Sequence, residues 1–113
     1  SAKIGSSGYS AKIGSSGDYA QIGSSGYSAK IGSSGDSAQI NSTGEDSVIM
    51  CAGNSSIAKA KVGSWITLTE WKWSDEKKHN VPVCVKTEYV DGENIKADTW
   101  YQLKNGKFVE VNE

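Results

Sequence analysis

The residues of this chain that could carry out chemistry are few and widely spaced. His79 is the only histidine, and it lies in the polar segment Ser74–Asn80, where we expect it to be exposed to solvent. The acidic residues are scattered, without a clear pair that could share acid and base roles. A nucleophile, base and orienting group cannot be assembled with confidence around one loop histidine. The sequence therefore predicts no catalytic residues, and we expect that the protein is not an enzyme.

Two cysteines, Cys51 and Cys84, are the only thiols of the chain. Neither a Cys-x-x-Cys pair nor the Cys/His spacing of a zinc site is present, so we expect no metal and no cofactor. We interpret the two residues as reduced thiols, as is usual in a cytosolic protein. A single Cys51–Cys84 bridge that ties the first half of the chain to the second is the alternative.

Gly-Ser-Ser-Gly segments recur through the first half, and they differ from known ligand-binding loops. They lack the Lys-Ser/Thr ending and the following helix of a phosphate-binding loop. Calcium-binding repeats of similar length carry Asp in a Gly-Gly-x-Gly-x-Asp turn, whereas Tyr often follows the turns here, as at Tyr9 and Tyr27. Ice-binding solenoids use flat ranks of Thr, where this chain has Lys and Gln. We interpret these positions as solvated faces with stacked Tyr9 and Tyr27; a regular lattice that binds a periodic ligand is the alternative.

These segments belong to a nine-residue repeat. Six units span residues 1–54, with the consensus x-Ala-Lys/Gln-Ile-Gly-Ser-Ser-Gly-Tyr/Asp, and a degenerate seventh spans residues 55–63. Ala and Ile flank an outward Lys or Gln in each unit, so we expect a short strand with one buried face. The Gly-Ser-Ser-Gly that follows predicts a turn in which glycine adopts positive φ and serine bonds nearby backbone groups.

The variable positions resemble one another mostly more closely at a spacing of 18 residues than at nine. The ninth position reads Tyr9, Asp18, Tyr27 and Asp36 in the first four units. We therefore predict an all-β fold, a parallel β-solenoid with two units per coil, three coils over residues 1–54 and two opposed sheets. The predicted core consists of two isoleucine ladders with alanines beside them. These residues are Ile4, Ile22 and Ile40; Ile13, Ile31 and Ile49; and Ala2, Ala11, Ala20, Ala29 and Ala38.

The repeat ends near Val62, and residues 63–113 have a different composition. The strands predicted there are Ser64–Trp71, Val81–Val90, Thr99–Lys104 and Lys107–Val111. Asn105-Gly106 is a strong signal for a hairpin turn between the last two. We predict a small antiparallel unit of four or five strands over residues 63–113, which caps a solenoid of residues 1–62.

All four tryptophans lie in the C-terminal unit: Trp65, Trp71, Trp73 and Trp100. We expect them to form the core of this unit and its contact with the solenoid. The alternative is an exposed aromatic platform that binds sugar or another ligand. The residues of a candidate interaction surface are Tyr9, Tyr27, Trp71, Trp73 and Trp100.

Charge and hydropathy argue against nucleic acid and membrane as partners. The net charge is −1 and all twelve basic residues are Lys, so the chain lacks the Arg that usually reads phosphate and guanine. No apolar run approaches the roughly 20 residues that cross a bilayer, and no signal peptide is present. The chain begins at Ser1 inside a repeat, so we expect it to be part of a longer protein. We also expect self-association, through the open edge of the first coil or through the C-terminal unit.

Two families resemble parts of this sequence. Asp46–Lys61 (DSVIMCAGNSSIAKAK) resembles head repeats of trimeric autotransporter adhesins, which form a left-handed β-roll, but it has Met50-Cys51 where those repeats have Gly. Nearly the whole chain is similar to phage and prophage proteins of unknown function from gut Firmicutes. The similar segments are YSAKIGSSGDYAQIGSSG, GSWITLTEW and VDGENIKADTWYQLKNGKFVEV. This resemblance implies a viral or mobile-element origin, localisation in the cytoplasm of a bacterial host or in the virion, and no catalytic residues.

We therefore expect a structural or protein-interaction module, a rigid spacer that ends in a capping unit. One alternative is a phage-encoded inhibitor that binds a host defence protein. Another is a carbohydrate-binding or adhesin-like tip that uses the Trp-rich C-terminal unit.

Overall fold

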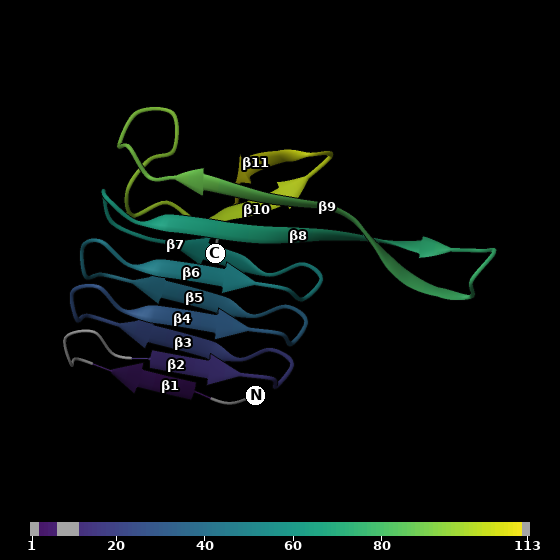
Figure 1. Ribbon diagram of the computed structural model, residues 1–113, viewed down its shortest axis with the longest axis horizontal. Helices are drawn as coiled ribbons and strands as arrows, with labels where there is room; N and C mark the ends of the chain where they lie inside the picture. The colour runs from purple at the N-terminus through teal and green to yellow at the C-terminus, as the bar shows by residue number, and fades with distance from the viewer. Residues whose placement is uncertain (1–2, 7–11, 112–113) are drawn as a thin grey trace.

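The computed structural model describes residues 3–6 and 12–111, which form strands and no helix. The strands are β1 (Lys3–Ser6), β2 (Lys12–Ser15), β3 (Gln21–Ser24), β4 (Lys30–Ser33), β5 (Gln39–Ser42), β6 (Val48–Cys51), β7 (Ile57–Lys59), β8 (Trp65–Ser74), β9 (His79–Tyr89), β10 (Tyr101–Lys104) and β11 (Lys107–Glu110). Strands β1-β3-β5-β7-β10-β11 form sheet A in that order, and β2-β4-β6-β8-β9 form sheet B. Figure 1 shows the repeat strands stacked in coils beneath the C-terminal hairpins.

Strands of the repeat pair in parallel with strands one coil away, as predicted. In sheet A, Ile4 pairs with Ile22 and Ile22 with Ile40. In sheet B, the same column consists of Ile13, Ile31 and Ile49. Each step is 18 residues, so two nine-residue units make one coil. The degenerate seventh unit supplies β7, which pairs with β5 and begins a further coil.

The inward face of each coil carries more than the predicted Ile and Ala. Ala20, Ala29 and Ala38 are buried as expected, whereas Ala2 and Ala11 lie outside the described residues. The first Gly and Ser of each Gly-Ser-Ser-Gly belong to the strand, not to a turn, because pairing continues through them. Ser33 and Ser42 therefore point inward and are buried, and Cys51 takes the same position one coil beyond Ser33.

The turn depends on a residue other than the expected glycine. The left-handed backbone conformation falls on the first residue of each unit, with φ of 59° at Tyr19, 58° at Ser28 and 56° at Ser37. The expectation that the glycines of the Gly-Ser-Ser-Gly turns supply positive φ is therefore wrong for the part of the chain that is described. In the degenerate seventh unit, Gly63 does have positive φ. The last glycine of each turn is needed for another reason. A Cβ at Gly35 would overlap the carbonyl oxygen of Gly17, since the coils stack backbone on backbone there.

Aspartate at alternate turns links one coil to the next. The Asp36 amide donates to the Asp18 carboxylate at 2.9 Å, and the Asn54 amide donates to the Asp36 carboxylate at 2.9 Å. This ladder explains in physical terms why Asp recurs every 18 residues in the sequence.

The C-terminal unit continues both sheets of the solenoid. Strand β8 pairs in parallel with β6 and antiparallel with β9, while β10 pairs antiparallel with β7 and β11. The predicted antiparallel strands are present, but they are two hairpins, each attached to a different sheet. Strands β8 and β9 are longer than predicted and extend into Ser74–Asn80, which was expected to be a loop. Their far end projects beyond the solenoid as an arm (Figure 1).

Aliphatic residues and one tyrosine form the core of the C-terminal unit. The buried residues there are Ile66, Leu68, Val90, Ile95, Tyr101 and Leu103. The expectation that tryptophans form this core is wrong, because strand alternation sends Ile66 and Leu68 inward and Trp65 outward. Trp71 does contact the solenoid, since its indole nitrogen donates to the Ala52 carbonyl at 2.7 Å.

Charged residues end both sheets on their inward side. Lys86 and Glu88 of edge strand β9 lie opposite Leu68 and Ile66, and their charged groups are 3.5 Å apart. Glu110 of edge strand β11 forms a 3.3 Å ion pair with Lys96. Inward charges on an edge strand oppose the addition of a further strand. These residues therefore give the C-terminal unit the property expected of a cap.

Candidate interaction face

Five exposed apolar side chains gather on the outer face of sheet B. They are Val48, Met50, Trp65, Val85 and Tyr89, with exposed fractions of 41%, 55%, 48%, 63% and 42%. Strand alternation places them there, because their neighbours in sequence, such as Ile49 and Ile66, fill the core. We refer to these five residues as the apolar patch.

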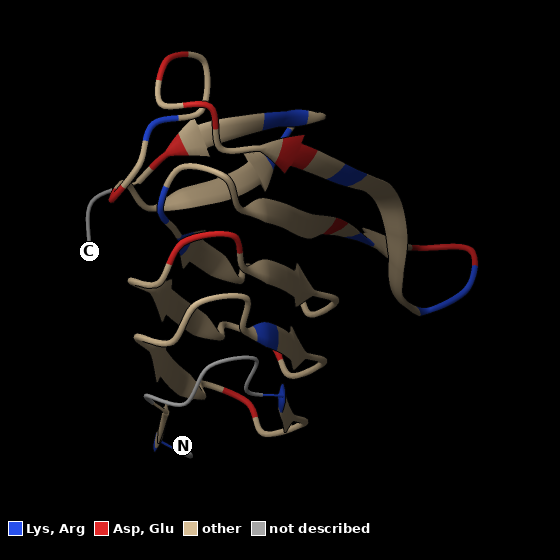
Figure 2. Ribbon diagram, turned by 60° about the vertical axis from the view of Figure 1, so that its left-hand side comes forward, with Lys and Arg blue, Asp and Glu red and all other residues tan. Residues whose placement is uncertain are grey.

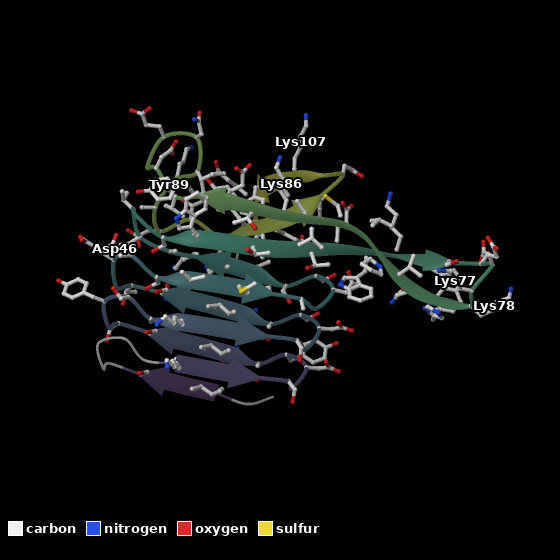
Figure 3. All side chains as sticks on the ribbon, viewed as in Figure 1. Asp46, Lys77, Lys78, Lys86, Tyr89 and Lys107 are labelled. Atoms are coloured by element: carbon white, nitrogen blue, oxygen red, sulfur yellow. The ribbon has the colours of Figure 1, made fainter. Side chains whose placement is uncertain are left out.

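Strand register brings most of the apolar patch together, while Val85 lies further along β9 opposite Thr69. Val48 pairs with Trp65, and Trp65 pairs with Tyr89, so three of its residues form a row across β6, β8 and β9. The Trp65 and Tyr89 rings lie 4.9 Å apart between centroids, and Figure 3 labels Tyr89. Beside this row, the hydroxyls of Thr67 and Thr87 are 2.8 Å apart. Patches of this kind on a soluble protein mark sites of interaction.

A groove continues from the apolar patch over the first two coils. Its floor is Gly14 and Gly32, its sides include Lys12 and Lys30, and Met50 lies at its end. The volume of this groove is about 560 Å³. A Cβ at Gly14 or Gly32 would meet no atom within 4 Å. The fold therefore does not require glycine at either position, although glycine inside a strand costs about 0.5–1 kcal/mol relative to alanine.

The outward positions on this side of the molecule form rows that repeat from coil to coil. The first row is Lys12, Gly14, Ser16 and Asp18; the second is Lys30, Gly32, Ser34 and Asp36; the third is Val48, Met50, Ala52 and Asn54; the fourth is Trp65, Thr67, Thr69 and Trp71. The first two rows have a lysine at one border and an aspartate at the other. Figure 2 shows the acidic residues of the solenoid in its turns.

A small cleft separates the arm from the turns of the solenoid. Its lining is Ser34, Asp36, Gly53, Asn54, Trp71 and Asn80, and its volume is about 200 Å³. The bond from Trp71 to the Ala52 carbonyl fixes the indole ring at this cleft. Among the described residues, the side-chain amides of Asn54 and Asn80 have no hydrogen-bond partner. An aromatic ring beside free amides and a carboxylate is an arrangement that can hold a sugar.

The residues expected to form an interaction surface do not come together. Tyr9 lies outside the described residues, and Tyr27 is an exposed turn residue. Trp73 lies on the arm, 60% exposed, and its indole nitrogen donates to Asp75 at 3.0 Å. Trp100 belongs to the sheet A side, where the Lys59 ammonium is 5.0 Å from its ring centroid.

Sequence reasoning missed the residues of the apolar patch, although the repeat contained a signal for two of them. Val48 stands where the first five units have Lys or Gln, and Met50 stands where the first four have Gly. Both substitutions fall at outward positions, so a break in the consensus marked a change of surface rather than a change of core. Trp65 and Tyr89 gave no such signal, because they follow the repeat.

The titratable residues form no reactive cluster in the part of the chain that the structure describes. His79 is exposed, as expected, and its Nδ1 lies 2.8 Å from the Asn80 carbonyl oxygen. Cys51 and Cys84 are free thiols, and burial raises the pKa of Cys51 to about 12. Residues 3–6 and 12–111 contain no group of three or more His, Cys, Asp or Glu that could hold a metal ion. They also include no helix long and apolar enough to cross a membrane.

Comparison with family models, curated proteins and solved structures gives no match to this chain.

Proposed function

We propose that this chain is a non-catalytic β-solenoid module that acts as a structural or protein-interaction element in a protein of phage or prophage origin. The apolar patch carries this proposal, because it is exposed, three of its residues form one row, and it is held on a sheet whose strands are paired coil by coil. A rigid face of this kind can bind a partner without ordering a loop, which lowers the entropy cost of association.

The sequence resemblance supports the origin and the setting of the module. A phage or prophage protein would act in the cytoplasm of a bacterial host or in the virion. The two free thiols are consistent with a reduced compartment. The partner is then a protein, and a host defence protein would be that partner if the chain is an inhibitor.

Binding of a saturable protein partner tests this function. The full chain is immobilised and exposed to a lysate of the bacterial host, and to soluble chain as a second potential partner. Met50→Lys places a charge in the apolar patch, whereas Val62→Lys places the same charge at a residue that is 48% exposed outside it. We expect Met50→Lys to abolish binding and Val62→Lys to preserve it. The function is wrong if no protein binds saturably, or if binding survives Met50→Lys.

A second candidate function is recognition of a neutral sugar at the cleft beside Trp71. The supporting observation is the fixed indole ring together with Asp36, Asn54 and Asn80. Titration of a glycan panel with tryptophan fluorescence as readout tests it. A bound sugar should change the emission of the parent chain and of Trp73→Ala, which leaves the cleft intact, but not that of Trp71→Ala. A panel without any response, or an equal response of Trp71→Ala, excludes this function.

A further inference from the structure

The outer face of sheet B has two properties that the fold leaves unexplained. Gly14 and Gly32 point outward with open space above them, and neither has positive φ. The apolar patch lies on the same face and begins on β6, the strand next to that of Gly32. Glycine in a strand often marks a place where another backbone approaches closely. One surface that covers the whole face would explain both properties.

The order of residues in the rows of sheet B indicates which molecule could supply the covering surface. A two-fold axis parallel to the solenoid axis would place two such faces against each other with their strands antiparallel. The first residue of each row then lies opposite the last residue of the same row in the other copy. The second residue likewise lies opposite the third.

This pairing opposes unlike charges in the first two rows and a large side chain to a small one in the third, where Val48 also lies opposite Asn54. In the first two rows, Lys12 and Lys30 lie opposite Asp18 and Asp36 of the other copy, with opposite charges. The inner residues of these rows pair glycine with serine, which leaves room for close approach of the two sheets. In the third row, the long side chain of Met50 lies opposite the small Ala52.

The fourth row supports the same arrangement. It reads Trp65, Thr67, Thr69 and Trp71, so it is the same in both directions. Indole then lies opposite indole, and a threonine opposite a threonine. A surface that meets a copy of itself across a two-fold axis must be self-complementary in this way.

The other two-fold arrangement is less favourable. An axis parallel to the strands would reverse the order of the rows, so Lys12 would lie opposite Trp65 and Lys30 opposite Val48, with no aspartate facing either lysine. A charged group that is buried against an apolar side chain loses its hydration without gaining a partner. The opposed lysine and aspartate borders therefore favour the axis parallel to the solenoid.

Sheet A does not have these properties. Its outward positions carry Lys3 in the first coil but Gln21 and Gln39 in the next two, and Trp100 lines the groove over its glycines together with Asn41. The ninth position on that side is Tyr27 and then Glu45. The rows of sheet A therefore lack the opposed lysine and aspartate borders.

We propose that a second copy of this chain docks on the outer face of sheet B, related by a two-fold axis parallel to the solenoid axis. The glycine-floored groove and the apolar patch are both buried in this dimer. The inference rests on the proposed function, because it names the partner of the interaction module.

Sedimentation velocity across a range of concentrations tests the dimer. The parent chain should form a dimer, and Gly14→Thr with Gly32→Thr should weaken it by about tenfold or more, since two side chains then separate the sheets. Threonine favours strands and fits the open space, so this variant should fold. Gly5→Thr with Gly23→Thr is the matched control on sheet A, and it should leave the dimer unchanged.

Charge reversal tests the orientation. Lys12→Glu with Lys30→Glu should weaken the dimer by about tenfold or more at low salt, because glutamate then faces aspartate, and added salt should reduce the loss. Lys77→Glu with Lys78→Glu makes the same change in charge at the tip of the arm (Figure 3) and should have no effect.

Three results would overturn the inference. They are a monomer at every concentration, a dimer that persists in the Gly14→Thr and Gly32→Thr variant, and a dimer that is insensitive to reversal of Lys12 and Lys30. A persistent dimer would assign self-association to the edge of β1 or to the C-terminal unit. If the chain is monomeric but a host protein still binds in a Met50-dependent manner, the dimer fails and the proposed function stands.

Discussion

The solenoid and the C-terminal unit use different kinds of contact to hold their strands. In the solenoid a residue contacts its equivalent one coil away, as when the Asp36 amide donates to Asp18. In the C-terminal unit the partners are unrelated in sequence, as when the amides of Asn105 and Gly106 donate to Glu70 at 2.8 and 3.1 Å. The loss of stability caused by a substitution in the solenoid therefore depends on its column, the set of equivalent positions in successive coils. In the C-terminal unit the cost depends on one particular partner.

Each region contains one cysteine, and we expect the largest difference between the regions in the rates at which these two thiols react. Cys51 lies in the buried serine column, and burial raises its pKa from 9.0 to about 12, so its thiolate fraction near neutral pH falls about 1000-fold. Cys84, half-buried on β9, should react first with a thiol reagent, and Cys51 only after unfolding. Mass spectrometry of labelled fragments measures both rates. Cys84→Ser is the control, because Cys51 is then the remaining thiol and its rate is measured by itself. Equal labelling rates of Cys51 and Cys84 in the native protein would contradict the solenoid register at Cys51.

Two glycines of one coil show how strongly the effect of a substitution on the free energy of unfolding depends on its column. Gly35→Ala should lower the free energy of unfolding by about 3 kcal/mol, because the new methyl group overlaps the backbone of Gly17. Gly32→Ala, three residues earlier, meets open space and should raise it by about 0.5–1 kcal/mol. Urea unfolding followed by circular dichroism, at one protein concentration, measures the difference. If the two variants were equally stable, the close stacking of the turns would be wrong.

The sequence predicted the solenoid well because residues that stack in the fold recur at a constant spacing in the sequence. Ile recurs every nine residues, whereas Asp18 recurs as Asp36 after 18, and this longer spacing of the variable positions indicated the coil length and the register of both sheets. The details of the turn could not be predicted this way. Gly35 stacks closely on Gly17 and Ser37 has positive φ, but the position of Ser37 is Tyr19 one coil earlier, so neither spacing nor residue size says which position of the turn has which task.

The C-terminal unit was predicted less well, because nothing in it repeats. Hairpin signals located the turn at Asn105-Gly106, where both residues have positive φ. They did not reveal that the two hairpins attach to different sheets. Tryptophan was expected inside because of its size, but the strand phase sends Trp65 outward. The apolar patch therefore became visible only when the register had placed Val48, Trp65 and Tyr89 side by side.

The aspartate ladder gives a smaller effect that belongs to the solenoid alone. Asp36→Ala removes the acceptor of the Asn54 amide and should lower the free energy of unfolding by about 1 kcal/mol. Glu45→Ala removes a carboxylate at the equivalent position of the opposite turns, and it should change stability less. Urea midpoints of the two variants and the parent chain measure this. Equal losses would mean that the ladder is worth no more than a surface charge.

The smallest effect concerns Glu70 and pH, and it belongs to the C-terminal unit. The amide hydrogen bonds from Asn105 and then Gly106 hold the pKa of Glu70 below its ordinary value of 4.5. As the pH falls below 4.5, the unfolded chain takes up the proton first, so the stabilisation by Glu70 is present above 4.5 and is lost as the pH falls through the lower folded pKa. Glu70→Gln should therefore be less stable than the parent chain at neutral pH, and the difference should shrink in acid.

Thermal unfolding between pH 3 and 7 measures the stability difference between Glu70→Gln and the parent chain. Asp91 also has a lowered pKa, because the amides of Glu93 and Ile95 donate to it, so both chains lose stability in acid and only their difference reports on Glu70. Glu76→Gln makes the same change in net charge in the turn of the arm, away from the Asn105-Gly106 turn, and is the control for the change in charge. If the Glu70→Gln difference is constant with pH, the carboxylate does not hold the Asn105-Gly106 turn, and the attachment of the two hairpins to each other depends on their apolar core alone.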